Sequence, residues 1–152
     1  MPRTEFHRDL PVKTAPADAW NALVDVPRLV GWASIVEDAV ELEPLSKYTA
    51  VLMDRLGPFK LRADLDVTVS DVVEGESLKV KAIGEDRQVG SRLLVLATML
   101  VRREEHGSTI VVDGVYEVTG KVASMGPGTI NKKAQKVLDD FFGAAGGDLG
   151  TV

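Results

Sequence analysis

One segment of the chain alternates strictly between apolar and polar side chains from residue 59 to residue 69. Its apolar members are Phe59, Leu61, Ala63, Leu65, Val67 and Val69, and Lys60, Arg62, Asp64, Asp66 and Thr68 lie between them. Side chains of a β-strand point alternately to its two faces, so the segment predicts a strand with one apolar and one solvated face. Such a strand belongs to an antiparallel sheet whose apolar face another element must cover.

Similar patterns predict further strands along most of the chain. A first strand carries Phe6, Arg8, Leu10 and Val12 on one face, and six more are predicted at 35–42, 48–55, 59–72, 77–84, 91–102 and 109–119. The short segments between these six strands contain Gly, Pro or Ser, which favour turns. Neighbouring strands are therefore expected to pair as antiparallel hairpins.

Helices are predicted after the first strand and at the C-terminal end. Pro16 suits the first turn of a helix that carries Trp20, and a further helical turn carries Trp32. Residues 130–141 form a longer helix with one apolar stripe, made of Ile130, Ala134, Val137, Leu138 and Phe141. The glycine-rich sequence that follows predicts a flexible tail over residues 144–152.

These elements predict an α+β fold in a single domain, residues 1–143. The order is one strand, two helices, six strands and a final helix, and the length of 152 residues suits one domain. The apolar face of the sheet and the stripe of the last helix must cover each other. A curved antiparallel sheet wrapped around one long helix seldom fills completely, so we expect a cavity for a small apolar molecule.

Charge and composition exclude several classes of function. The chain has 18 Lys and Arg against 23 Asp and Glu, a formal net charge of −5, which disfavours binding to nucleic acid or to anionic lipid. It contains no cysteine, so disulfides and thiolate metal sites are excluded. No apolar run approaches the ~20 residues of a membrane span, and the N-terminal segment lacks the apolar core of a signal peptide. A cytoplasmic protein is therefore expected.

Few residues could carry out catalysis. The two histidines, His7 and His106, are expected on a solvated strand face and in a hairpin loop, and their spacing does not predict a zinc site. Neither a nucleophile motif nor a phosphate-binding loop occurs in the sequence. No catalytic residue, metal ion or cofactor is predicted. An enzyme would need a polar group inside the cavity, and Arg8, Thr98 and Tyr116 are the candidates.

The predicted ligand site is the apolar face of the sheet together with the stripe of the last helix. Arg8 shares a face with Phe6, and it either contacts a polar atom of the ligand or extends its charge to the rim of the cavity. The apolar members are either core or pocket wall. The predicted ligand-binding residues are Arg8, Trp32, Phe59, Leu61, Leu65, Val67, Leu94, Leu96, Thr98, Tyr116, Ile130, Ala134 and Val137.

Several motifs resemble a known family. Trp20-Asn-Ala-Leu-Val-Asp25 and Leu29-x-x-Trp32, after the first strand, resemble the START-like SRPBCC superfamily. Three further segments are similar to CoxG, a family of proteins named for carbon monoxide dehydrogenase, and the resemblance as a whole covers residues 5–142. The segments are Gly57-Pro-Phe-Lys-Leu-Arg62, Gly107-Ser-Thr109, and Gly120-Lys-Val-Ala-Ser-Met-Gly126 with the helix that ends in Leu138-Asp-Asp-Phe141-Phe142.

The resemblance implies a helix-grip fold and a non-catalytic accessory role beside a molybdenum-containing carbon monoxide dehydrogenase or a related hydroxylase. It implies a hydrophobic or amphipathic ligand that is lipid-like or polycyclic, and a quinone would link such an enzyme to the respiratory pool. Membrane contact is then at most peripheral, at the inner face of the membrane. Two alternatives stay open: an enzyme of the polyketide cyclase or dehydrase kind, and a ligand-free docking or assembly module with a filled interior.

Overall fold

The computed structural model of the chain describes residues 3–152, so residues 1 and 2 of the predicted domain lie outside the described part. The elements are β1 (Thr4–Val12), α1 (Pro16–Val24), α2 (Val26–Gly31), β2 (Val36–Glu43), β3 (Lys47–Leu56), β4 (Phe59–Val73), β5 (Ser77–Asp86), β6 (Ser91–Glu104), β7 (Gly107–Gly120), the 3₁₀ helix η1 (Lys121–Met125) and α3 (Pro127–Leu149). The predicted order and α+β class are confirmed.

One antiparallel sheet of seven strands, in the order β1-β7-β6-β5-β4-β3-β2, forms the main layer. The alternation predicted for β4 is confirmed, because Ala63, Leu65 and Val69 are buried while the charged residues between them are exposed. Leu65 pairs with Ala50 of β3 and with Gly84 of β5. A Cβ atom at Gly84 would lie 2.7 Å from Leu65 Cδ2, so only glycine lets Leu65 lie across the neighbouring strand.

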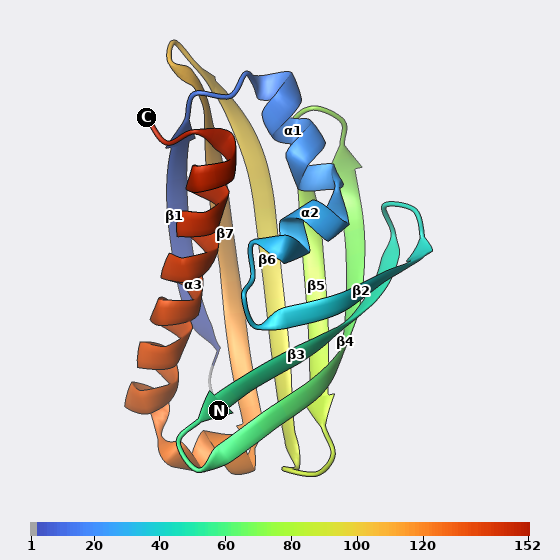
Figure 1. Cartoon of the computed structure of the whole chain (residues 1–152), viewed down its shortest axis with the longest axis vertical. Helices are drawn as coiled ribbons and strands as arrows, with labels where there is room; N and C mark the ends of the chain where they lie inside the picture. The colour runs from blue at the N-terminus through green and yellow to red at the C-terminus, as the bar shows by residue number, and fades with distance from the viewer. Residues whose placement is uncertain (1–2) are drawn as a thin grey trace.

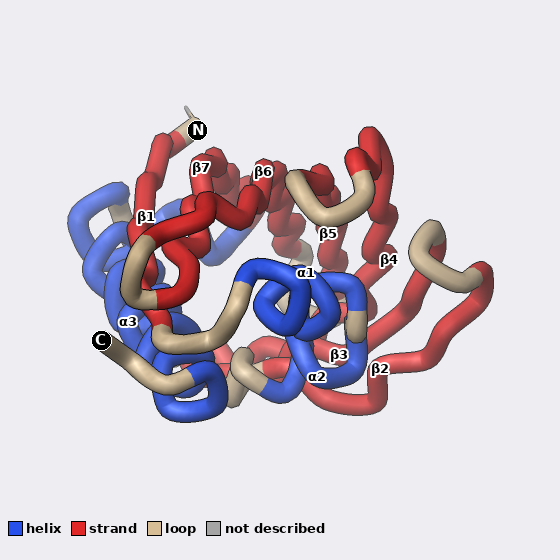
Figure 2. Tube along the Cα trace, turned by 90° about the horizontal axis from the view of Figure 1, so that it is seen from above, coloured by secondary structure: helices blue, strands red, loops and turns tan. Residues whose placement is uncertain are grey.

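The sheet curls, so that β2 and β3 cross in front of the strands behind them (Figure 1). Viewed from above, α1 and α2 lie within this curl and α3 lies near β1 (Figure 2). Asp25 ends α1 and begins α2, where its carboxylate accepts a hydrogen bond from the Arg28 backbone N–H at 3.3 Å. Helix α1 packs on β6 and β7, whereas α3 packs on β1 and η1.

The predicted flexible tail over residues 144–152 is wrong, because α3 continues to Leu149. Ala145, Gly146 and Leu149 are buried, and the Lys13 backbone N–H donates to the Gly150 carbonyl at 2.7 Å. A Cβ at Gly146 would lie 2.5 Å from Thr151 Oγ1, so the absence of a side chain permits the close approach of Thr151. These glycines belong to a packed helix end and not to a linker.

The long helix begins at Pro127, which occupies the first turn, where its missing N–H costs no hydrogen bond. None of the helices within residues 3–152 combines the length and the apolar character needed to cross a membrane.

Candidate functional site

A cavity of about 380 Å³ lies between the inner face of the sheet, α2 and α3. Its walls are almost wholly apolar and come from β3 to β7, the α2–β2 junction and α3. Pockets of this size hold small organic ligands. Among the lining side chains are Leu52, Leu61, Leu65, Val67, Leu93, Val95, Met99, Val112, Tyr116, Ile130, Ala134, Val137 and Phe141.

The cavity exists because α3 lies along one edge of the sheet. Its main contacts are with β1 and η1, and across the cavity it meets the hairpin end of β3 through the Lys133–Asp54 ion pair. The apolar stripe of α3 therefore faces the cavity. Leu138 and Phe141 of α3, and Val30 and Ile35 of the α2–β2 junction, line the cavity but are only half-buried. We call this side, between α3 and the α2–β2 junction, the mouth of the cavity.

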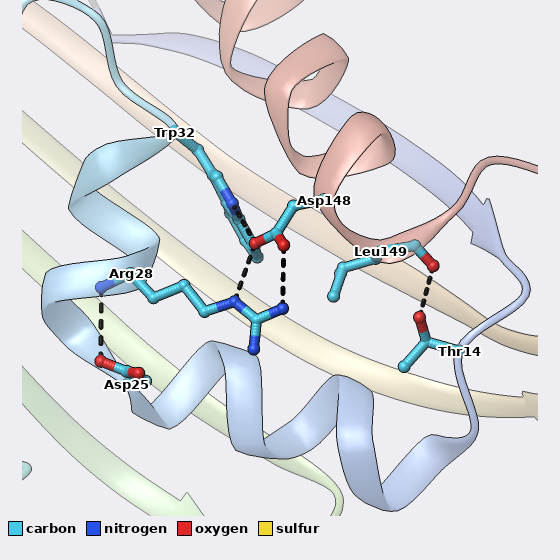
Figure 3. A network of polar contacts seen from close by, with 6 residues as sticks. All are labelled: Thr14, Asp25, Arg28, Trp32, Asp148 and Leu149. Atoms are coloured by element: carbon cyan, nitrogen blue, oxygen red, sulfur yellow. Dashed lines mark hydrogen bonds and ion pairs between the residues drawn. The ribbon is translucent and has the colours of Figure 1, made fainter.

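Two polar contacts connect α3 with elements on the other side of the cavity. Lys133 Nζ lies 3.0 Å from Asp54 Oδ2 of β3, and both residues line the cavity. Nearer the C-terminus, Asp148 accepts hydrogen bonds from Arg28 Nε at 2.8 Å and from Trp32 Nε1 at 2.9 Å (Figure 3). These bonds hold the pKa of Asp148 below its ordinary value, the one from Arg28 most strongly. The α2–α3 contact is thus held by a charge-assisted network.

The buried polar side chains of the cavity wall are paired within the protein. The Tyr116 hydroxyl donates to Asn131 Oδ1 at 2.5 Å, and the Asp86 carboxylate accepts from backbone N–H groups of Arg62 and Val89. No buried side-chain N or O atom within residues 3–152 lacks a hydrogen-bond partner. The buried part of the site therefore offers a ligand apolar contact area and no unpaired polar side chain, while Arg92 lines it at an exposed position.

Seven of the residues predicted as ligand-binding meet around this cavity. They are Leu61, Leu65, Val67, Tyr116, Ile130, Ala134 and Val137. Phe59 lies beside it, in an apolar cluster that also includes Tyr116 and Ile130.

The predicted placement of Arg8 and Trp32 needs correction, since neither lines the cavity. The Arg8 guanidinium contacts Gln135 Oε1 at 2.7 Å and Asp139 Oδ1 at 3.1 Å, and so ties β1 to the outside of α3. Trp32 is buried against the edge of Phe141, with ring centroids 5.8 Å apart, and its N–H is bonded to Asp148. Of the two alternatives for Arg8, a position in contact with a ligand in the cavity is not observed, and both Arg8 and Trp32 have their polar partners on α3.

The predicted face of β6 is wrong. Leu93, Val95, Ala97 and Met99 line the cavity, while Leu94, Leu96 and Thr98 point to the opposite face of the sheet. Both faces of β6 are apolar, so its alternation alone cannot choose between them. The pairing of Val95 with Tyr116 shows which face of β6 points inward, because Tyr116 lines the cavity and directly paired residues share a face. The inward residues of β6 could have been predicted by pairing β6 with β7 across their hairpin and assigning to β6 the same inward face as β7.

Both histidines lie outside the cavity. The His7 ring lies between Asp113, with Nδ1 2.5 Å from Oδ1, and Asp9, with Nε2 3.0 Å from Oδ1. The hydrogen bond with Asp113, followed by that with Asp9, raises the pKa of His7. His106 Nε2 lies 3.2 Å from the Ser108 carbonyl in the β6–β7 hairpin. No cluster of metal-ligating side chains occurs in the described part of the chain.

Solved structures share the fold at low sequence identity. A conserved protein from Geobacillus kaustophilus superimposes with a TM-score of 0.79 at 17% identity, over 97% of this chain and 95% of its own. Protein CV1439 from Chromobacterium violaceum gives 0.60 at 14%, over 94% and 96%. Ara h 8.0201 gives 0.57 at 15%, over 93% and 97%. These likenesses establish the helix-grip fold, in which the sheet wraps around the C-terminal helix.

The sequence itself identifies the family. No curated protein matches the chain. The pattern of CoxG, the G component of carbon monoxide dehydrogenase, by contrast matches residues 10–145, which include every strand from β2 to β7, both short helices and most of α3. The chain belongs to the carbon monoxide dehydrogenase CoxG family.

Proposed function

We propose that this protein is a non-catalytic carrier that binds a neutral, hydrophobic small molecule, lipid-like or quinone-like, in the cavity between the sheet and α3. The observation that carries the proposal is an apolar cavity of about 380 Å³ in whose described wall every buried side-chain N and O atom has a hydrogen-bond partner within the protein. An unpaired charge on the ligand would lose its hydration inside such walls without a partner to replace it. A neutral apolar molecule can enter without this loss of hydration free energy.

The contacts with the ligand are assigned to the cavity walls. Leu61, Leu65 and Val67 of β4 face Ile130, Ala134 and Val137 of α3 across the space, and Tyr116 closes one side. The mouth between α3 and the α2–β2 junction is the route of entry, because its rim side chains are apolar and half-buried.

Family membership supports an accessory role beside a molybdenum hydroxylase of the carbon monoxide dehydrogenase type. A carrier of a redox-active apolar molecule would exchange electrons between such an enzyme and a membrane pool. The protein would then act in the cytoplasm, with at most peripheral contact at the inner face of the membrane. A pull-down of the hydroxylase from the native host, with and without the bound ligand, tests this role separately from binding.

The ligand itself is identified by native mass spectrometry of protein purified from its host, followed by solvent extraction. We expect a co-purifying neutral, apolar compound at up to one per chain. Protein that carries no such compound, and that also fails to bind the neutral dye Nile red, would contradict the proposal.

A cavity-filling substitution locates the binding site. Ala134→Trp should abolish the rise in Nile red fluorescence, because the indole ring would occupy the space that the dye needs. Lys136→Trp is the matched control, since Lys136 lies on the exposed side of the same helix and its substitution should leave dye binding unchanged. Equal binding by both variants would place the dye elsewhere.

The cyclase or dehydrase alternative is less well supported. It needs a free polar group in the cavity, but Arg8 and Thr98 lie outside it and the Tyr116 hydroxyl is bonded to Asn131. A binding assay with Tyr116→Phe separates the two functions: a carrier keeps its affinity for the extracted compound within about threefold.

A further inference from the structure

The outer face of the sheet, opposite the cavity, carries an apolar strip. It consists of Ile83, Leu94, Leu96, Leu100, Val111 and Val115, which we call the outer strip; Val111 is buried and the others are half-buried. Helices α2 and α3 face the cavity on the opposite side and α1 packs into the same core, so no described helix covers the strip. A sheet face exposed to water is normally polar, and a group of aliphatic side chains on it, here crossed by the row that carries Thr98, is typical of a contact surface.

Charged residues of opposite sign flank the strip on its two sides. A hollow of about 700 Å³ lies over Leu96 and Val115 of the strip, with Glu5 and Asp113 of β1 and β7 on one margin and Lys79 and Lys81 of β5 on the other. Lys79, Thr98 and Asp113 occupy one row across the sheet, because Thr98 pairs with both of the others. The strip therefore has a basic side and an acidic side.

This arrangement is complementary to itself. A two-fold axis that runs parallel to β6, midway between two facing copies, lays β5 of one copy over β7 of the other. The Leu94, Leu96 and Leu100 side chains then meet their own counterparts, and Lys79 lies over Asp113 of the second copy. A two-fold axis perpendicular to the strands would instead place lysine over lysine, and electrostatic repulsion disfavours it.

We propose that the outer strip is the interface of a symmetric homodimer, formed by two sheets packed face to face about an axis along β6. Closed two-fold dimers are the commonest oligomers, and their interfaces are self-complementary in this way. The contacts that Lys79 and Asp113 make within one copy do not compete strongly with the proposed contact between copies. Lys79 lies 3.6 Å from Asp71 and His7 contacts Asp113, and all four side chains are more than half exposed, where such pairs contribute little.

The size of the strip sets the strength of the dimer. The three strands that carry the strip, spaced by about 4.8 Å, and about six residues along β6 cover roughly 300 Å² on each copy before side-chain relief is counted. The two faces together bury less than the roughly 1,200 Å² of a stable specific interface, so we expect a weak dimer that dissociates at micromolar concentrations.

Sedimentation equilibrium of the full chain, from about 5 to about 500 µM, measures the association directly. We expect a monomer–dimer equilibrium that Leu96→Asp weakens by at least about tenfold, because it places a carboxylate in the apolar centre. Val40→Asp is the matched control: Val40 is 52% exposed on β2, away from the strip, and its substitution should not change the association.

A charge exchange tests the orientation of the two copies. Lys79→Glu and Asp113→Lys should each weaken the dimer, whereas the double variant should restore it to within about threefold, because it reverses both charges of the same pair. Circular dichroism confirms that each variant is folded, and the double variant keeps the test valid if one single variant is not.

Chemical cross-linking tests the position of the proposed two-fold axis along β6. The chain contains no cysteine, so Thr98→Cys introduces a single thiol near the proposed axis. Facing sheets lie about 10 Å apart, too far for a direct disulfide, so a short bis-maleimide should link two copies through residue 98. A cysteine at Val40 should not be linked.

A monomer throughout the concentration range, a dimer insensitive to Leu96→Asp, or a double variant no better than the single ones would each overturn the proposal. None of these outcomes depends on the cavity, so the proposed carrier function is tested independently of the dimer.

Discussion

Single buried side chains hold the ends of this sheet in place, and Asp86 is the clearest example. It lies at the end of β5 and accepts backbone hydrogen bonds from Arg62 of β4 at 2.8 Å and from Val89 in the following turn at 3.0 Å. Burial alone would raise the pKa of Asp86, but the backbone donors Val89, Arg62 and Gln88 outweigh it and lower the pKa. The ionised carboxylate is therefore the form that stabilises the fold.

Asp86→Ala should lower the free energy of unfolding by about 1–3 kcal/mol at pH 7, because the partly buried backbone N–H bonds of Arg62 and Val89 lose their acceptor. Since the folded pKa is depressed, this stabilisation is present above the unfolded pKa of about 3.9 and is lost as the pH falls through the folded value. Urea unfolding at pH 7 and pH 3 should show a smaller difference between wild type and variant at the lower pH. Asp66→Ala, at an exposed position of β4, serves as control and should change stability by less than about 0.5 kcal/mol.

At the scale of elements, the C-terminal half of α3 shows how tertiary contact turns a glycine-rich sequence into a helix. Gly143, Gly146 and Gly147 each weaken a helix through the conformational freedom they retain when unfolded. Packing of Ala145 and Leu149, together with the Asp148 network to α2, compensates for that loss. The helix end is therefore held in place by its neighbours.

Substitution of these glycines by alanine distinguishes a packed helix from a tail. Gly143→Ala should raise the free energy of unfolding by about 0.5–1 kcal/mol, because the added methyl meets no atom and the helix gains a better former. Gly146→Ala should instead destabilise, since its methyl would meet Thr151. Chemical denaturation measures both, and equal, negligible effects would indicate that this segment is not packed as a helix.

At the scale of the whole molecule, the curled sheet and α3 enclose a space that the protein's own side chains leave open. An apolar compound that fills it would bind the folded state only, and would therefore stabilise that state by mass action.

Addition of the extracted compound at about 100 times its dissociation constant should stabilise the protein by about 2.7 kcal/mol, and so raise the Tm by roughly 5–10 °C. Differential scanning calorimetry measures this rise. The Ala134→Trp variant, whose cavity is filled, should show no rise, and an equal rise in both proteins would mean that the compound binds elsewhere.

Local periodicity determined much of this architecture. The alternation in β4 and β7, the turn residues between the strands and the apolar stripe of α3 are properties of short stretches, and each holds wherever its segment packs. Six of the cavity residues could be predicted for that reason, because they belong to β4 and α3, each of which has only one apolar face.

The remaining features, namely the inward face of β6, the length of α3 and the partners of Arg8 and Trp32, depend on contacts between distant parts of the chain. The inward face of β6 depends on its pairing with β7, since both faces are apolar, and the length of α3 depends on contacts with Leu10 and Thr151. Arg8 and Trp32 turn to partners on α3 that lie more than a hundred residues away along the chain. Local pattern specifies which elements form, whereas long-range pairing specifies which way their ambiguous faces point and where they end.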